Sequence, residues 1–153
     1  MIDQITTREG EPKDIPAVMK LIRELAIFEK CEDSVAVDEN ELLRHGFSDH
    51  PDYGFYVAEV DGQIVAMAFY YYCFSTWRGR YLYLEDLIVN EAYRQHGVGS
   101  VLFEKLVEKT KSEGLRQMGW QVLDWNIPAI KFYKKHGSIL DDGWINGRLY
   151  FNQ

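Results

Sequence analysis

Two glycines lie directly before a segment that has the pattern of a helix. Gly97 and Gly99 follow Arg94. The apolar positions of the next segment recur at three- and four-residue spacing, at Val98, Val101, Leu102 and Leu106. The first N–H groups of a helix have no partner within it, the helix dipole favours negative charge there, and glycines let a ligand approach the backbone closely. We therefore expect this loop to bind an anionic phosphate group.

The loop differs from two familiar phosphate-binding motifs. It is not a P-loop, because no Gly-Lys-Ser or Gly-Lys-Thr follows, and it lacks the third glycine of the dinucleotide fingerprint. Glycines also begin helices that bind no ligand, so the loop alone leaves a purely structural role open.

Two adjacent carboxylates, Glu85 and Asp86, lie in a strand predicted over 80–89. Successive side chains of a strand point to opposite faces of the sheet, so the two should not enter one cleft or act as a pair. Glu85 could also be a solvated carboxylate at a strand edge.

A tyrosine lies on the last predicted helix. Asn126 and Pro128 are typical of a helix start, and Tyr133 follows Ile130 by three residues, on the face that should turn inward. Taken alone, this pattern is typical of a packed tyrosine with one hydrogen-bond partner.

Changes in the hydrophobic period predict the elements that must position these residues. Strands are expected over 4–9, 53–60, 63–74, 80–89 and 117–123, with a last pair around 143–151. Helices are expected over 12–30, 39–47, 98–113 and 126–137. The order indicates one α/β domain, residues 1–153, with a mixed, mainly antiparallel sheet.

Three local signals support these boundaries. Asp61-Gly62 should form the turn of a hairpin. Asp38 should cap the second helix, and Gly46 should end it in a left-handed conformation.

Charge and composition exclude some classes of function. The 153 residues include 24 acidic and 17 basic side chains, a net charge of −7, which argues against a nucleic-acid partner and suits cationic ligands. No apolar stretch approaches the ~20 residues that cross a bilayer, and no secretory signal is recognisable, so we expect a soluble cytoplasmic protein without a membrane partner. Cys31 and Cys73 lack metal-ligand spacing and are expected to be reduced core thiols, with no metal site.

The motifs resemble those of a known family. RQHGVG, residues 94–99, resembles the Arg/Gln-x-x-Gly-x-Gly/Ala pyrophosphate loop of the GCN5-related N-acetyltransferases (GNAT). The segments LIRELAIFEK, HPDYGFYVAEV, LYLEDLIV, GVGS, DWNIPAIKFYKKHG and GW are similar, in order and spacing, to the diamine (spermidine/spermine N1-) acetyltransferase branch and its thialysine-acetylating relatives. The resemblance covers nearly the whole chain and implies a GNAT fold.

The resemblance also implies site residues. Tyr133 would be the general acid, Glu85 would bind the amine and accept its proton directly or through water, and Asp86 would serve structure. Acetyl-coenzyme A would be held by Leu87, Ile88, Val89, Arg94, Gln95, His96, Gly97, Val98, Gly99, Ser100, Asn126, Ile127, Pro128, Ala129 and Tyr133. The amine would be held by Phe28, Glu29, Trp77, Glu85, Gly119, Trp120, Gln121, Val122, Asp142 and Trp144.

The implied activity is acetyl transfer from acetyl-coenzyme A to a primary amine of a small diamine or polyamine, by direct attack on the thioester. One alternative is acetylation of thialysine or a lysine-like amino acid. Another, of a different class, is a regulatory acyl-coenzyme A-binding module without turnover. The sequence departs from the polyamine enzymes at Ser75, two residues before Trp77, where they carry an acidic residue. The family also implies a homodimer, into which the segment 143–151 could pair or swap.

Overall fold

The structure is a computed structural model that describes residues 4–152, and it divides into two compact units at Trp120. The first unit contains β1 (Thr6–Glu9), α1 (Ile15–Phe28), α2 (Glu39–Gly46), β2 (Gly54–Val60), β3 (Gln63–Ser75), β4 (Gly79–Val89), α3 (Val98–Ser112) and β5 (Met118–Gly119). Short 3-10 turns lie at η1 (Pro12–Asp14), η2 (Glu32–Ser34) and η3 (Glu91–Tyr93). The second unit contains α4 (Ile127–Lys135). Each unit is described by itself.

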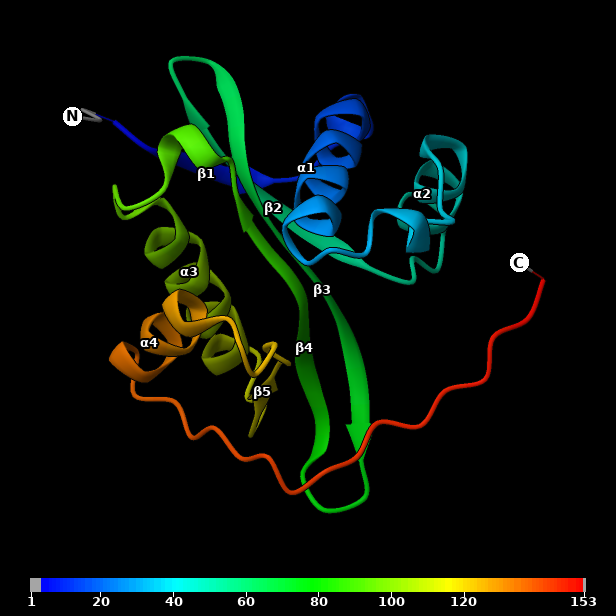
Figure 1. Ribbon diagram of the computed structural model, residues 1–153, viewed down its shortest axis with the longest axis vertical. Helices are drawn as coiled ribbons and strands as arrows, with labels where there is room; N and C mark the ends of the chain where they lie inside the picture. Colours follow the sequence, from blue (N-terminus) through cyan, green and yellow to red (C-terminus); the bar gives the residue numbers. More distant parts are fainter. Residues whose placement is uncertain (1–3, 153) are drawn as a thin grey trace. The chain divides into compact units, whose positions relative to one another are not determined.

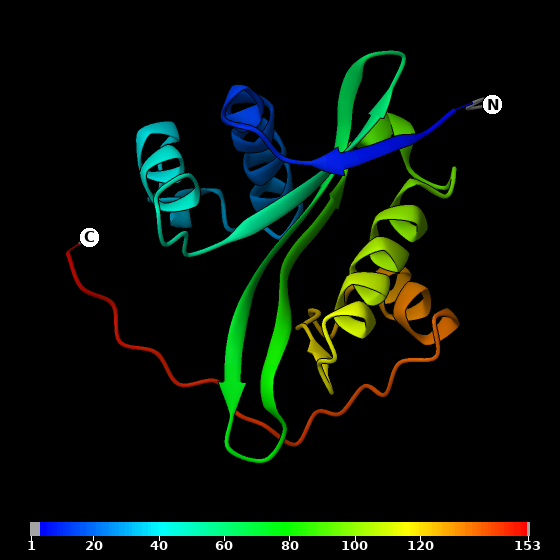
Figure 2. The same ribbon diagram turned by 180° about the vertical axis from the view of Figure 1, so that it is seen from behind.

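The sheet has the order β1-β2-β3-β4-β5 (Figure 1). The first four strands are antiparallel to their neighbours, whereas β5 pairs in parallel with β4. The expected mixed, mainly antiparallel sheet is therefore confirmed. α1 and α2 lie on one side of the strands and α3 on the other (Figures 1 and 2).

The face under α1 holds an apolar core. Val57 pairs with Met67, and Met67 pairs with Ile88, so the three side chains share one face of the sheet. They pack with buried residues of α1, α2 and the start of β2, namely Ile15, Val18, Met19, Leu21, Leu42, Tyr53 and Phe55. The N-terminal half of the first long helix thus contributes an apolar face to this core.

The hairpin between β2 and β3 turns where the sequence predicts. Asp61 and Gly62 have φ values of 52° and 77°, both positive, as a two-residue type I′ turn requires. β3 then extends beyond its neighbour, because the first residue of β2, Gly54, pairs with Tyr70. Residues 71–75 of β3 pair with β4 and form the long hairpin arm of Figures 1 and 2.

Helix starts follow their sequence signals closely. The Asp38 side chain accepts a hydrogen bond from Glu41 N at 2.9 Å, and the Asn126 side chain accepts one from Ala129 N at 3.3 Å. The first long helix is shorter than predicted, because η1 precedes Ile15 and α1 ends at Phe28.

Gly46 lies at the end of the second helix as predicted, but the predicted left-handed conformation is wrong. It is the last residue of α2, and its φ is not positive. A Cβ at Gly46 would lie 2.4 Å from Cζ of Tyr53, so the glycine is needed for close packing rather than for a left-handed end.

The predicted C-terminal strands are not formed. The strand expected over 117–123 is reduced to β5, and residues 120–152 of the described chain contain no strand. A strand needs a neighbour for its backbone groups, and the alternating pattern of 143–151 supplies none by itself. Apolar side chains are exposed along this segment, at Ile139, Trp144, Ile145, Leu149, Tyr150 and Phe151.

The cysteines are also placed differently. Cys31 is exposed and Cys73 is half-buried, so the expectation of two core thiols is wrong for Cys31. Cys31 lies in the turn after α1, where its thiol donates to the carbonyl of Glu29 at 3.3 Å.

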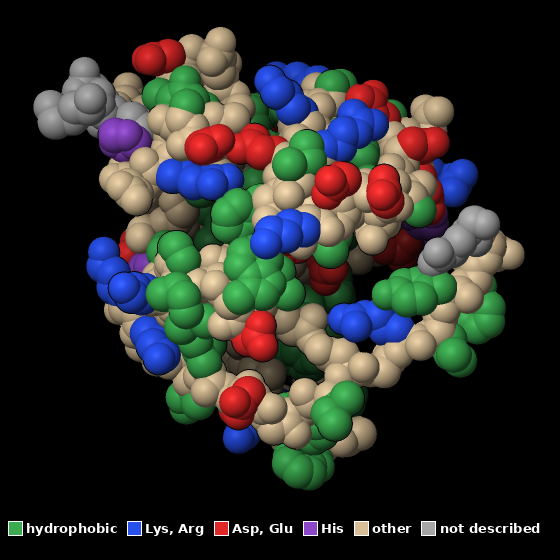
Figure 3. All heavy atoms as spheres, in the orientation of Figure 1, with side chains coloured by type: hydrophobic (Ala, Val, Ile, Leu, Met, Phe, Trp, Pro, Cys, Tyr) green, Lys and Arg blue, Asp and Glu red, His purple; other side chains and the backbone are tan. Residues whose placement is uncertain are grey.

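Within residues 4–152, no helix is both long and apolar enough to cross a membrane. Acidic and basic side chains are interspersed on the face seen in Figure 3.

Candidate active site

A β-bulge in β4 sets the position of the two adjacent carboxylates. Phe69 pairs with Asp86, whereas the next residue of β3, Tyr70, pairs with Leu84. Glu85 is therefore an extra residue in β4, and side chains before and after it do not follow one alternation.

The bulge brings Glu85 and Asp86 to the same face of the sheet. Asp86 shares the face of its partner Phe69, which packs against the α1 core. Glu85 Oε2 accepts a hydrogen bond from the hydroxyl of Tyr71 at 2.8 Å, and Tyr71 also packs against that core. The prediction that these two carboxylates point to opposite faces is thus wrong, because it assumed an unbroken strand.

Asp86 is a weaker acid than an ordinary aspartate. Burial, together with repulsion by the negative charges of Glu85 and Glu29, raises its pKa to about 7. Glu29, directly after α1, also has a raised pKa, because of burial. Two carboxylates, Glu85 of β4 and Glu29 after α1, therefore both act on Asp86.

Aromatic rings accompany the carboxylates. Tyr71 and Tyr83 are opposite each other on β3 and β4, with ring centroids 5.3 Å apart. Burial raises the pKa of both phenols, and for Tyr71 the hydrogen bond to Glu85 adds to the effect. Both phenols therefore stay protonated near neutral pH, and ring faces beside carboxylates favour a cationic ligand.

The loop after β4 leads into α3, which begins at Val98 as the sequence predicts. Gly97 is the residue before α3 and has a φ of 83°. Because it has no side chain, it cannot cap the first N–H groups of α3. A Cβ there would meet no atom of residues 4–152 within 4 Å, so the space beside the helix start is open. Gln95 is also left-handed, with a φ of 65°.

Arg94 is fixed at the start of this loop. Its Nε donates to the carbonyl of Val89 at 3.0 Å, and its Nη2 lies 3.6 Å from Glu24 Oε1 of α1. The guanidinium carbon lies 5.4 Å from the centre of the Phe28 ring. Phe28, expected to contact the amine, thus contacts the arginine of the predicted phosphate loop.

The other predicted residues of the first unit lie in three places. Leu87, Ile88 and Val89 form the end of β4, where Ile88 is a core side chain. Trp77 lies in the turn of the hairpin arm and is 89% exposed. Gly119 pairs with Tyr83, and Trp120 packs edge-to-face on Phe103 of α3, with ring centroids 5.3 Å apart.

The second unit carries the remaining predicted residues. Asn126, Ile127, Pro128 and Ala129 form the start of α4, and Tyr133 is buried, as its spacing predicted. The carbonyl of Tyr133 accepts a hydrogen bond from the Ser138 hydroxyl at 2.7 Å. Gln121 donates to Asn146 Oδ1 at 2.8 Å, Val122 is half-buried, and Asp142 and Trp144 are exposed.

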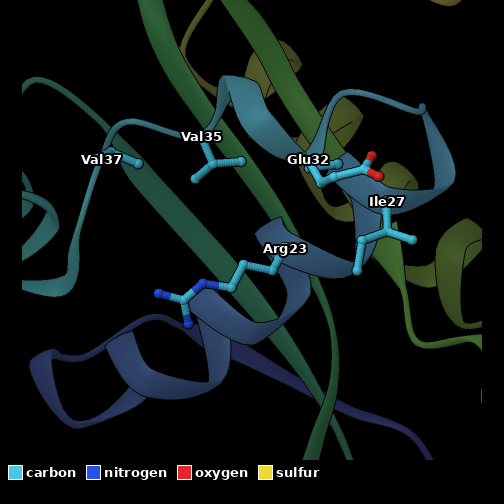
Figure 4. A pocket seen from close by; sticks show the side chains of 6 residues that line it. Arg23, Ile27, Glu32, Val35 and Val37 are labelled. Carbon is cyan, nitrogen blue, oxygen red and sulfur yellow. The ribbon is translucent and has the colours of Figure 1, made fainter. Parts of the chain in front are cut away.

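A separate pocket of about 220 Å³ lies between α1 and the segment after it (Figure 4). It is lined by Arg23, Ala26, Ile27, Glu32, Val35 and Val37, and none of these is a predicted site residue. Among residues 4–152, there is no group of three or more His, Cys, Asp or Glu side chains that could hold a metal ion.

Little in the sequence identifies Asp86 as an ionisable residue of the site. Apolar residues alternate at Leu82 and Leu84 and then run together at 87–89, which breaks the period of two next to the carboxylates. That break is the one local sign of a bulge.

Known proteins resemble this chain along most of its length. A family model described as the acetyltransferase (GNAT) family matches residues 17–138. The thialysine N-epsilon-acetyltransferase of Bos taurus is 38% identical over 142 residues, which cover 88% of this chain and 84% of that protein. The spermidine/spermine N(1)-acetyltransferase-like protein 1 of Homo sapiens is 32% identical over 153 residues, covering 94% of this chain and 22% of that protein. The crystal structure of an aminoglycoside acetyltransferase from an uncultured soil metagenomic sample, in complex with trehalose, has a TM-score of 0.79 and 16% identity over 97% of both chains, a likeness of fold.

The raised pKa of Asp86 predicts a pH-dependent stability. Between the ordinary aspartate pKa of about 4 and the folded value of about 7, the folded chain keeps a proton that the unfolded chain has lost. Raising the pH through this range should therefore destabilise the fold. The variant Asp86→Asn lacks this penalty, so its stability relative to wild type should grow from pH 5 to pH 8, by on the order of a few kcal/mol at most.

Urea unfolding at several pH values measures the difference. Asp49→Asn, at an exposed position, is a matched control that should keep the wild-type slope. If the stability of Asp86→Asn and of wild type changed with pH by the same slope, the raised pKa of Asp86 would be contradicted.

Proposed function

Because the chain belongs to the acetyltransferase (GNAT) family, we propose that it acetylates a primary amine of a small substrate that carries a second cationic centre. A thialysine-like amino acid is the first candidate, since the thialysine acetyltransferase of Bos taurus matches most of the chain. A short diamine is the second. The observation that carries the proposal is the position of Glu85 and Asp86 beside the rings of Tyr71 and Tyr83, with Glu29 as a further negative charge acting on Asp86.

Charge complementarity supports an amine with two positive centres. Glu85 is exposed and accepts the Tyr71 hydroxyl through one oxygen, which leaves its other oxygen for an ammonium group. Glu29 comes from a different element, the end of α1, and could meet a second cation. Each such contact, partly desolvated, is worth about 1 to 3 kcal/mol.

Asp86 is suited by its raised pKa to accept the proton of the amine. The amine binds as an ammonium but attacks only after it has lost a proton. A carboxylate with a pKa of about 7 holds that proton more readily than one with an ordinary pKa near 4. Glu85 would then bind the cation, and Asp86 would accept the proton directly or through water, in place of the structural role first expected.

The loop at α3 fits the diphosphate of acetyl-coenzyme A. Its backbone N–H groups begin a helix, Gly97 adds no side chain, and Arg94 carries a positive charge at its start. When bound, acetyl-coenzyme A supplies the acetyl group as a thioester. The whole predicted set, residues 87–89, 94–100, 126–129 and 133, stays a proposal that the family supports.

Tyr133 is proposed as the general acid. Its hydroxyl would donate a proton to the departing thiolate. This transfer is only modestly uphill, because a phenol pKa of about 10 lies little above a thiol pKa of about 8.5. Its burial in the second unit is consistent with a desolvated proton donor.

Ser75 supports a short substrate. Its Oγ accepts hydrogen bonds from the backbone N–H groups of Trp77 and Arg78, both at 3.1 Å. The side chain is therefore used in the local turn and offers no negative charge to the far end of a long polyamine.

A panel of amines tests the choice of substrate. With a thiol-release assay, thialysine and propanediamine should exceed butylamine in kcat/KM by about tenfold to a hundredfold, which is the equivalent of one charged contact. Both should equal or exceed spermine. Glu29→Gln should reduce the advantage over butylamine, whereas Glu32→Gln, an exposed position three residues further on, should not.

Two results would overturn the proposal. Butylamine reacting as fast as the dications would exclude an acidic amine site. Binding of coenzyme A without thiol release for any amine would instead favour the non-catalytic module.

Tyr133→Phe tests the general acid. The change removes one hydroxyl and little volume, so kcat should fall about a hundredfold while the dissociation constant of coenzyme A stays within twofold of wild type. Phe132→Leu, at the neighbouring position, is the control for packing within α4. Wild-type turnover of Tyr133→Phe would remove this residue from the mechanism.

We also propose that the chain forms a homodimer. The support is the run of exposed apolar side chains between Ile139 and Phe151, since contiguous apolar surface marks an interaction site. A second copy is the partner that is always present. The cytoplasmic location and the absence of a nucleic-acid partner stay predictions.

Light scattering at micromolar concentration should give twice the chain mass. The double variant Ile145→Asp with Leu149→Asp should shift the mass toward that of one chain, because charges would have to be buried in the interface. Gly147→Asp adds charge to the same segment without removing an apolar side chain and should remain a dimer. A monomeric wild type would contradict the assembly.

A further inference from the structure

The turn that joins β4 to the predicted phosphate loop is hydrogen-bonded to one side chain of α1, that of Glu24. Glu24 Oε2 accepts a hydrogen bond from Asn90 Nδ2 at 3.1 Å, and Glu24 Oε1 accepts one from the backbone N–H of Glu91 at 2.9 Å. Both oxygens of this carboxylate are therefore used by η3, the turn immediately before Arg94.

Asn90 ties the same turn to the sheet. Its backbone N–H donates to the carbonyl of Val65 at 2.8 Å, and its side-chain oxygen accepts from Ala92 N at 3.1 Å. The side-chain amide of Asn90 donates to Glu24. The turn is thus fixed by β3 on one side and by α1 on the other.

Arg94 meets the same face of α1. Glu24 and Phe28 are four residues apart, so they lie one above the other on the helix. The Arg94 guanidinium lies near both of them and donates to the carbonyl of Val89, the last residue of β4. One helix face therefore sets the turn and the arginine together.

The loop beyond Arg94 has a conformation that needs such anchoring. Gln95 and Gly97 both have positive φ values, and for Gln95 this conformation is unfavourable. The N–H groups of α3 can bind a diphosphate only if the residues before them hold this path. Glu24 is only a quarter exposed, at 25%, so its charged hydrogen bonds are stronger than those at an open surface.

We propose that Glu24 is a positioning residue for the diphosphate of acetyl-coenzyme A. It touches neither reacting group, and it acts by fixing η3, Arg94 and the path of the loop into α3. The inference rests on the proposed function, because it assumes that this loop binds acetyl-coenzyme A.

Calorimetric titration with coenzyme A tests the inference. Glu24→Ala should raise the dissociation constant about tenfold, and Glu24→Gln, which keeps the shape and one accepting oxygen, about threefold. At saturating acetyl-coenzyme A, kcat and the KM for the amine should stay within twofold of wild type. Glu104→Ala, an exposed position on α3, removes the same charge and should leave the dissociation constant unchanged.

A truncated donor separates positioning from general damage. Acetyl-pantetheine carries the thioester but no diphosphate, so Glu24→Ala should lower kcat/KM for acetyl-coenzyme A about tenfold and leave kcat/KM for acetyl-pantetheine unchanged. Equal losses for the two donors would overturn the inference. Thermal unfolding of Glu24→Ala identifies a folding defect, and in that case Glu24→Gln decides the question.

The result also distinguishes this inference from the proposed function. Wild-type protein that fails to bind coenzyme A would defeat the proposed function. Wild-type binding together with unchanged binding by both Glu24 variants would defeat the positioning role alone.

Discussion

The extra residue in β4 is the constraint on which the candidate site depends. Before the bulge, Leu82 and Leu84 pair with Tyr72 and Tyr70, and after it Ile88 pairs with Met67 in the α1 core. Without the bulge, one of these two sets would point to the wrong face of the sheet, because a slip of one residue inverts every side chain. Both apolar faces can be buried only if one residue of β4 is left over, and that residue is Glu85.

Charged groups on the two faces of the sheet differ in how they are paired. On the face under α3, the Tyr72 hydroxyl contacts both oxygens of Glu113 at 2.8 and 2.9 Å, and Lys109 Nζ lies 3.2 Å from the same carboxylate. Charges there are balanced within the chain. On the α1 face, by contrast, burial raises the pKa of Asp86, and the charges of Glu85 and Glu29 contribute to the same rise. An unbalanced group of like charges costs stability and is typical of a site that awaits a ligand.

Features that depend on a few neighbouring residues could be predicted from the sequence. The caps at Asp38 and Asn126, the turn at Asp61-Gly62 and the start of α3 after Gly97 all follow from local chemistry. Features that depend on distant partners could not. The bulge comes from the register of β3 and β4 together, and Gly46 is required by the ring of Tyr53, seven residues away in sequence and outside α2. The segment 143–151 has the alternation of a strand, but alternation describes side chains and says nothing of where the backbone finds a partner.

The projecting end of β3 leaves a row of backbone groups on one side. Tyr71–Ser75 pair with β4, and β2 ends its pairing at Tyr70. An open strand edge is a template onto which another extended segment can add by backbone hydrogen bonds alone, whatever its sequence. The arm carries exposed Phe74 and Trp77 but also two arginines, Arg78 and Arg80, close to its tip. Like charges at the tips of two arms would repel each other, so the arginines disfavour pairing of one arm with another, and this repulsion weakens as salt screens the charges.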